Sequence, residues 1–171
     1  MAIVKEVRGF VPTHGEDCWF ADNAVLIGDI TMGDQCTVWF SAVVRGDVNS
    51  IRIGNNSNIQ DNATIHGTFE QASTTIGDNV TIGHNAIVHG CTLEDETMVG
   101  MGSIVMDNAV VKKGAIIAAG AVVLEGTIVE ENTIYAGVPA KKVKQIDQKN
   151  RSMMKRIANN YIRYASWFQE D

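Results

Sequence analysis

Hydrophobic residues recur every six positions along most of this chain, with two short insertions and a one-residue deletion. A small residue stands four positions after most of these anchors, and Gly, Asn or Asp fill many other places, which suits tight turns. The anchors are Phe20, Leu26, Met32, Val38, Val44, Ile53, Ile59, Ile65, Ile76, Ile82, Val88, Leu93, Val99, Val105, Val111, Ile117, Val123, Val129 and Tyr135. A period of six fits neither an amphipathic helix nor a long strand, so it indicates short strands separated by turns.

Short strands wound with one constant period predict a parallel β-helix. A sandwich of unrelated strands would not hold a single phase over so many repeats. The pattern resembles the hexapeptide-repeat left-handed β-helix family, in which three hexads make one triangular coil of about 18 residues. The resemblance implies an all-β fold with three faces, whose successive coils lie about 4.8 Å apart.

The six-residue rhythm stops at residues 137–139, and the apolar residues that follow have helical spacing. They are Val143, Ile146, Met153, Ile157, Tyr161, Tyr164 and Phe168. We expect a β-helix domain with an N-terminal lead-in over residues 1–140 and a C-terminal α-helix over residues 141–171, packed along it within the same single domain. This helix covers an apolar flank or makes an additional subunit contact, and its sequence shows no evident chemistry.

Composition narrows the class of protein. A chain of 171 residues with 45% hydrophobic content fits one soluble domain, and a formal net charge of -6 argues against a nucleic-acid or anionic-membrane surface. No apolar run approaches the roughly 20 residues that span a bilayer, and no signal peptide is evident, so we expect a cytoplasmic protein. Cys18, Cys36 and Cys91 are too widely spaced for a disulfide framework or a zinc ribbon, and Cys36 falls at a small-residue position of the core.

The period also predicts which residues stack in successive coils. Counting three faces in turn places on one face the anchors Leu26, Val44, Ile65, Val88 and Val105. The residues that directly follow these anchors then form a column containing Arg45, His66 and His89. His66 and His89 are therefore expected to be neighbours one coil apart, a spacing that suits two imidazoles binding one ion at about 2.0 to 2.1 Å each.

His84 is expected on a different face. It follows Ile82 by two residues, as Asp61 follows Ile59, so it should lie directly above Asp61 on the preceding face. Two faces of a triangular prism point in different directions, so a neighbouring chain would have to supply His84 to the other two histidines. A cyclic trimer would do this at three interfaces and make three metal sites. The alternative for any one of these histidines is a solvated side chain, as we expect for His14.

Three segments carry a resemblance to a known family. They read VRGD at residues 44–47, NIQDNATIH at 58–66 and IGHNAIVHGC at 82–91. Over about residues 11–143 the chain resembles the γ-class carbonic anhydrases, homotrimers that hydrate CO2 to bicarbonate with metal-bound hydroxide. The resemblance implies zinc, or alternatively iron or cobalt, bound across subunit interfaces by His66, His84 and His89.

The resemblance also implies roles for the neighbouring residues. Arg45 and Asp47 match a pair that links subunits and shapes the site, although a purely structural salt bridge is an equal alternative. Gln60 matches the residue that hydrogen-bonds the metal-bound water, and Asp61 matches its buried neighbour, which orients a ligand. Tyr135 is a candidate for lining the pocket.

The chain departs from the family pattern at two glutamates. The glutamate that follows the aspartate of the Arg-Gly-Asp segment is here Val48, and the acidic loop that carries a proton-shuttling glutamate is reduced to residues 68–75, with Glu70 alone. Proton removal from metal-bound water is a separate step that needs a titratable group or a water chain. The sequence therefore predicts metal binding and leaves open whether CO2 hydration is weak or absent.

Two other functions remain open at this stage. The chain could be a non-catalytic scaffold whose metal fastens a trimer together. It could also be a hexapeptide-repeat acyltransferase, although it offers three clustered histidines and no long acceptor-binding loop. The metal itself is not determined, because imidazole ligands suit zinc, iron and cobalt.

Overall fold

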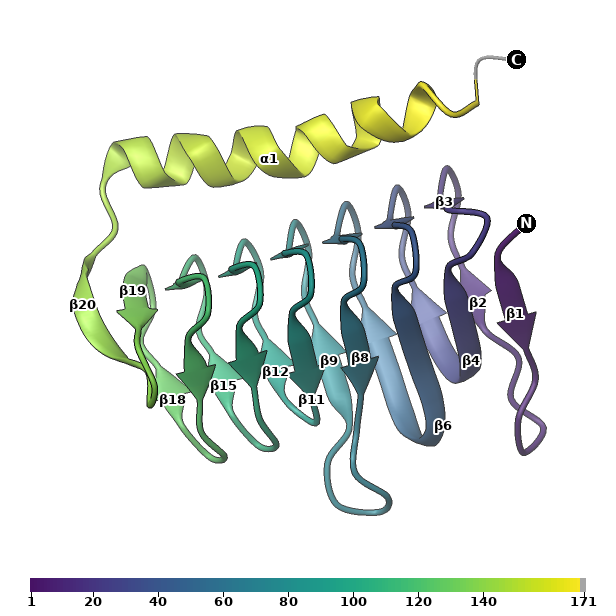
Figure 1. Cartoon of the computed structure of the whole chain (residues 1–171), viewed down its shortest axis with the longest axis horizontal. Helices are drawn as coiled ribbons and strands as arrows, with labels where there is room; N and C mark the ends of the chain where they lie inside the picture. Colours follow the sequence, from purple (N-terminus) through teal and green to yellow (C-terminus); the bar gives the residue numbers. More distant parts are fainter. Residues whose placement is uncertain (170–171) are drawn as a thin grey trace.

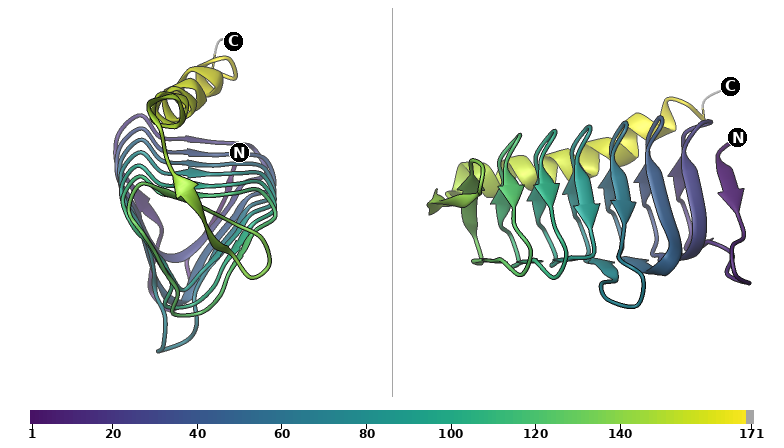
Figure 2. Two further views of the ribbon diagram at one scale, coloured as in Figure 1. Left: turned by 90° about the vertical axis from the view of Figure 1, so that its left-hand side faces the viewer. Right: turned by 60° about the horizontal axis from the view of Figure 1, so that its bottom comes forward.

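A computed structural model describes residues 1–169 of the chain as a parallel β-solenoid of about seven coils with one C-terminal helix. Seen end-on, the coils are triangular and stack in register (Figure 2). The predicted parallel β-helix is confirmed.

Three faces make up the solenoid (Figure 1). The first face contains β1 (Ile3–Lys5), β4 (Val25–Met32), β6 (Val43–Ile53), β8 (Thr64–His66), β11 (Ile87–His89), β14 (Ile104–Val105) and β17 (Val122–Val123). The second face contains β2 (Thr13–His14), the later halves of β4 and β6, β9 (Thr74–Ile76), β12 (Thr92–Leu93), β15 (Val110–Val111) and β18 (Ile128–Val129). The third face contains β3 (Trp19–Phe20), β5 (Thr37–Val38), β7 (Asn58–Ile59), β10 (Thr81–Ile82), β13 (Met98–Val99), β16 (Ile116–Ile117), β19 (Thr133–Ala136) and β20 (Lys141–Gln145).

The anchor residues fill the interior. From Leu26 to Val129 every anchor is at most 5% exposed, and the small residues four positions later are equally buried. Each coil turns at a residue three positions after an anchor, where the backbone adopts a positive φ, as at Asn62 (59°), Asn85 (57°) and Gly102 (65°). Asn and Gly tolerate this left-handed conformation better than other residues do. The six-residue period therefore combines one inward side chain with one turn.

The two insertions leave the stacking order unchanged. The first lies within β6, whose register against β4 shifts between Gly28 and Ile30. The second forms a loop between β8 and β9 that projects from a corner of the solenoid and is closed by a bridge between Thr68 and Ala72 (Figure 1). Both insertions lie at corners, so the faces on either side keep their pairing.

The C-terminal segment differs from the expected helix over residues 141–171. Residues Lys141–Gln145 instead form β20, which pairs antiparallel with β19, and Val143 is 61% exposed rather than packed. This pairing satisfies backbone groups at the open edge of the last coil, which outweighs the helical spacing of the side chains. The expectation also included residues 170 and 171, which lie outside the described residues.

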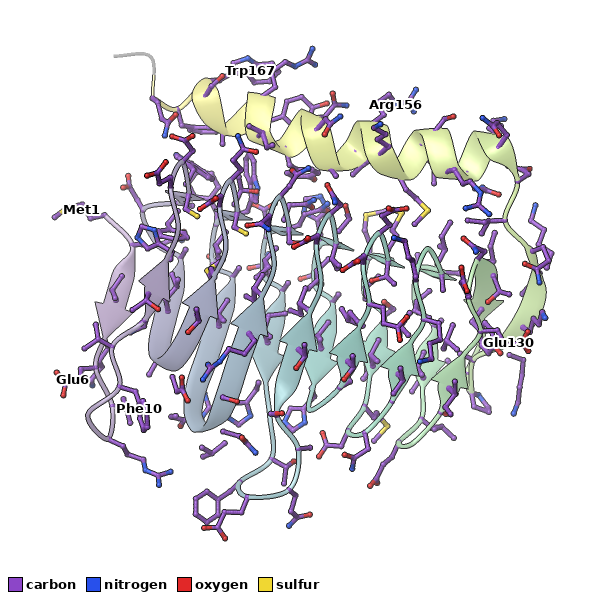
Figure 3. All side chains as sticks on the ribbon, turned by 180° about the vertical axis from the view of Figure 1, so that it is seen from behind. Met1, Glu6, Phe10, Glu130, Arg156 and Trp167 are labelled. Carbon is purple, nitrogen blue, oxygen red and sulfur yellow. The ribbon has the colours of Figure 1, made fainter. Side chains whose placement is uncertain are left out.

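Helix α1 (Gln148–Ser166) runs back along the solenoid from its last coils towards its first (Figure 1). It packs against β5 and β10 of the third face, and its buried residues are Met154, Ala158 and Ala165. Figure 3 shows Trp167 at the end of the helix that lies over the N-terminal coils. Among the described residues, no helix is both long enough and apolar enough to cross a membrane.

Asp147 caps α1 at its N-terminus. Its carboxylate accepts a hydrogen bond from the backbone N–H of Asn150 at 2.8 Å, and the Asn150 side chain accepts one from the Asp147 N–H at 3.2 Å. We expect Asp147→Ala to lower the free energy of unfolding by about 1 kcal/mol, because one helix N–H loses its acceptor. Urea denaturation followed by circular dichroism measures this loss. Lys149→Ala, at an exposed position of the same turn, is the control, and an equal loss in both variants would contradict the prediction.

Candidate metal centre

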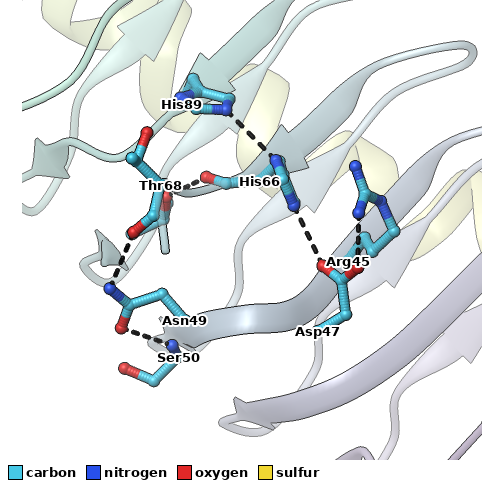
Figure 4. A network of polar contacts seen from close by, with 8 residues as sticks. Arg45, Asp47, Asn49, Ser50, His66, Thr68 and His89 are labelled. Atoms are coloured by element: carbon cyan, nitrogen blue, oxygen red, sulfur yellow. Dashed lines mark hydrogen bonds and ion pairs between the residues drawn. The ribbon is translucent and has the colours of Figure 1, made fainter. Parts of the chain in front are cut away.

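His66 and His89 lie side by side on the first face. Strands β8 and β11 pair in parallel with His66 directly opposite His89, and the Nδ1 of His66 lies 3.2 Å from the Nε2 of His89 (Figure 4). Two ligand atoms at about 2.0 to 2.1 Å from a tetrahedral zinc ion are roughly 3.3 to 3.4 Å apart. The predicted stacking is confirmed, and the two nitrogens have the separation that two ligands of one ion require.

The second ring nitrogen of each histidine is hydrogen-bonded to a carboxylate. The Nε2 of His66 lies 3.0 Å from Oδ1 of Asp47, and the Nδ1 of His89 hydrogen-bonds to Asp107. Carboxylates of this kind set the orientation and the tautomer of metal-binding histidines. Asp107 was not predicted from the sequence. The available signal was its position two residues after the anchor Val105, one coil beyond His89. The hydroxyl of the loop residue Thr68 also donates a hydrogen bond to Asp107.

The local electrostatics favour neutral imidazole beside ionised carboxylate. Burial lowers the pKa of His66. Burial acts to raise the pKa of Asp47, but hydrogen bonds from His66 and Arg45 bring it below its usual value. Burial likewise opposes the hydrogen bonds from Thr68 and His89 that lower the pKa of Asp107. Metal binding requires neutral imidazole, and the lowered pKa of His66 favours that form.

His84 lies apart from this pair, on the third face after β10. Its Nδ1 is 2.8 Å from Oδ2 of Asp61, as the predicted stacking requires. The Asp61 side chain is 31% exposed in the single chain. The other nitrogen of His84, Nε2, is 3.4 Å from the hydroxyl of Tyr161 on α1.

The described part of the chain does not assemble a complete ligand set by itself. Within residues 1–169, no three His, Cys, Asp or Glu side chains are close enough together to hold a metal ion. The structure brings His66 and His89 together and holds His84 on another face. A site that uses all three histidines therefore needs more than one copy of the chain.

The other predicted residues take different positions. The Nη1 of Arg45 donates to Oδ2 of Asp47 at 2.5 Å within the same chain. Gln60 is buried on the third face, and its Nε2 donates to Oδ1 of Asn58 at 3.1 Å. Tyr135 occupies an anchor position, so its side chain points into the core of the last coil. It lies three coils beyond Ile82 on the same face. It does not lie beside the histidines of its own chain.

An aromatic cavity of about 320 Å³ opens beside His84. Tyr161 stands edge-on to Trp39 in its wall, with ring centroids 5.1 Å apart. Burial, with the nearby charge of Asp61 and the Tyr164 phenol, raises the pKa of Tyr161 to about 12, so its hydroxyl stays protonated. The sequence predicted that this helix covers an apolar flank or makes an additional subunit contact, and Tyr161 appeared there only as one member of an apolar stripe. The cavity is lined by Trp39, Phe40, Asp61, His84, Tyr161, Tyr164, Trp167 and Phe168.

Comparison with known proteins identifies relatives over nearly the whole chain. The model of the hexapeptide repeat of succinyl-transferase matches residues 73–106. A carbonic anhydrase from Geobacillus kaustophilus is 35% identical over 98% of this chain and 91% of its own length. The mitochondrial gamma carbonic anhydrase 2 of Arabidopsis thaliana is 40% identical over 90% of this chain, which spans 57% of that protein.

Among solved structures, a hexapeptide transferase family protein from Anaplasma phagocytophilum superposes with a TM-score of 0.93 at 38% identity. The match covers 97% of this chain and 98% of that one. The identity to the Geobacillus protein extends along nearly the whole of both chains and is not confined to one stretch of repeats. The chain therefore belongs to the γ-carbonic anhydrase-like family of hexapeptide-repeat proteins.

Proposed function

We propose that this protein is a metal-dependent, γ-carbonic anhydrase-like enzyme that hydrates CO2 to bicarbonate at the interfaces of a homotrimer. His66 and His89 of one subunit and His84 of the next would hold zinc, with iron or cobalt as alternatives. The observation that carries the proposal is the facing pair of nitrogens on His66 and His89, 3.2 Å apart, with each ring fixed from behind by an aspartate.

The first face offers the surface that a trimer needs. Beyond the histidines it exposes large apolar side chains in successive coils, namely Ile87 (38%), Met106 (39%) and Leu124 (47%). Repeating one contact between this face and the third face of the next subunit closes a ring of three. Such a contact would cover these side chains and bring Nε2 of His84, in place of its contact with the Tyr161 hydroxyl, to the pair of nitrogens on the neighbouring subunit.

The residues around the proposed metal would have different roles. Zinc held by His66, His89 and the neighbouring His84 would make water acidic enough to supply hydroxide near neutral pH, which is the nucleophile that CO2 hydration needs. Asp47 and Asp107 hold His66 and His89 in the orientation observed, and Asp61 accepts the Nδ1 proton of His84, which leaves Nε2 with a lone pair. Arg45 neutralises Asp47.

Gln60 would use its remaining amide groups to orient water or substrate, since one N–H already bonds to Asn58. Val48 and the exposed loop residue Glu70 do not replace the two glutamates that speed proton removal in the family. We therefore propose slow hydration. The step limited by this change is the removal of the proton from water, not the attack on CO2.

Measuring CO2 hydration by stopped flow, with protein loaded with zinc or anaerobically with iron, tests the proposal. We expect a rate above that of buffer that disappears with a chelator and returns with metal. No rate above buffer at three metal ions per trimer would leave a metal-fastened scaffold as the function.

Acyl transfer is the second candidate, because the matching repeat model and the Anaplasma protein both carry transferase descriptions. Calorimetry with coenzyme A separates the two enzymes. Binding of coenzyme A by protein that contains no metal in elemental analysis would favour the transferase and contradict the metal proposal.

A further inference from the structure

Cys18 and Cys36 occupy the same position in successive coils. Each follows a turn residue with positive φ, and the turns are joined on both sides of the cysteines by backbone hydrogen bonds, from Gln35 N–H to Glu16 O at 2.8 Å and from Trp19 N–H to Cys36 O at 2.9 Å. Adjacent strands lie about 4.8 Å apart. This spacing falls within the Cα separation of about 4.4 to 6.8 Å that a disulfide spans.

The two thiols differ in access. Cys36 is fully buried, whereas Cys18 is partly exposed, and both are free. The Sγ of Cys18 lies 3.2 Å from the carbonyl oxygen of Gly33, three residues before Cys36, so the sulfur leans towards the coil that contains Cys36. A small solute would therefore meet Cys18 before Cys36, which is 0% exposed.

The two cysteines also differ in the pKa of their thiols. The neighbouring Cys36 thiol lowers the pKa of Cys18 to about 6 against the opposing effect of burial, and nearby His14 lowers it further. Closeness to Cys18 and burial raise the pKa of Cys36 far above its usual value, and the Cys36 thiol donates to the carbonyl oxygen of Gly54 at 3.0 Å. A thiolate is the form of cysteine that attacks peroxide, so Cys18 is the nucleophile in that step, and Cys36 is the thiol that condenses with the resulting sulfenic acid.

We propose that Cys18 and Cys36 are a peroxide-reactive thiol pair that closes reversibly to a disulfide between the first two coils. The Cys18 thiolate attacks one oxygen of hydrogen peroxide, the O–O bond breaks, and hydroxide leaves with Cys18 as a sulfenic acid. The Cys36 thiol then attacks this sulfur, and water leaves as the S–S bond forms and the thiol proton passes to the departing hydroxyl. Peroxide is reduced by the two electrons that the two thiols lose.

The pair lies outside the proposed metal centre, so this inference does not depend on the proposed function. The sequence had assigned Cys36 to the core and had given Cys18 no role, and the proposal assigns a function to both. Cys91 provides an internal control. It is buried and, because burial raises its pKa to about 12, it stays protonated at neutral pH.

The test treats the reduced full-length protein with a stoichiometric amount of hydrogen peroxide at pH 7. We expect the intact mass to fall by two hydrogen atoms, non-reducing peptide mapping to show a link between Cys18 and Cys36, and dithiothreitol to reverse it. Cys91 should remain a free thiol. A link between two chains, equal oxidation of Cys91, or no link would each overturn the proposal.

Two variants separate the roles of the pair. In Cys36→Ala the sulfenic acid should persist on Cys18 and be trapped by dimedone, whereas in Cys18→Ala the remaining Cys36 should resist peroxide as Cys91 does. If either variant fails to fold, alkylation of the wild-type protein by iodoacetamide at pH 7 decides. Cys18 should react at least about 10-fold faster than Cys91, and equal rates would refute its role as the nucleophile.

Discussion

Alanine in place of His84 should remove bound metal from the protein, from three ions per trimer to none under conditions that saturate the wild type. Loss of an outer hydrogen-bond partner of a metal ligand already weakens binding by about 10- to 100-fold, so loss of a ligand should weaken it by more than about 100-fold. The expected effect is large although His84 is far from His66 and His89 in its own chain. Elemental analysis after gel filtration measures the metal content.

His14→Ala is the matched control, because the only other histidine of the chain bonds to the carbonyl of its neighbour Gly15 and takes no part in the proposed site. This variant should keep three ions per trimer. Analytical ultracentrifugation of His84→Ala then assigns the use of the metal. If the variant remains a trimer without metal, the ion is not needed for assembly and a catalytic role stays open. If the trimer is lost together with the metal, the ion serves to hold the subunits together. Retention of metal by His84→Ala would contradict the proposed ligand set.

Ile117→Ala should be among the most destabilising single changes in the solenoid. Ile117 is fully buried on the third face, with Val99 on one side and Tyr135 on the other. Removing its outer carbons leaves a cavity that neighbouring coils cannot fill without breaking their register, and such changes cost about 2 to 5 kcal/mol. Urea denaturation at constant protein concentration measures the loss, since assembly also contributes to stability.

Ile128→Ala makes the same chemical change at a position that is 63% exposed on β18. It should cost less than about 1 kcal/mol, because little apolar surface returns to water. The difference between the two variants measures burial at the anchor position. If both lost the same stability, the six-residue anchors would not be the source of the core.

The repeating part of the molecule could be predicted because it is periodic. The pairing of Val44 with Ile65, of Ile65 with Val88 and of His66 with His89 follows from counting hexads, and the strand register confirms each of them. A regular coil of about 18 residues, lengthened only at the corners by insertions, converts sequence distance into stacking distance, so His66 and His89 become neighbours although they are 23 positions apart. The same count placed His84 over Asp61.

Residues outside the period could not be placed in this way. Asp107 lies within the period, two residues after Val105, but its side chain is also held by Thr68 of the corner loop, which has no period. Tyr161 reaches His84 only because α1 folds back over the third face. The segment of β20 has helical spacing, but the open edge of β19 offered it backbone partners.

The amino-acid sequence by itself determined the solenoid, the three faces and the separation of the histidines into a pair and a third residue, because these depend on which positions are apolar and how many residues make a coil. Only the tertiary structure decided which carboxylates hold His66 and His89, that α1 contributes an aromatic wall beside His84, and that the thiol of Cys18 lies against the carbonyl oxygen of Gly33 in the next coil. These contacts depend on side-chain direction and on the packing of segments without a period, and both are set by what the rest of the folded chain leaves free.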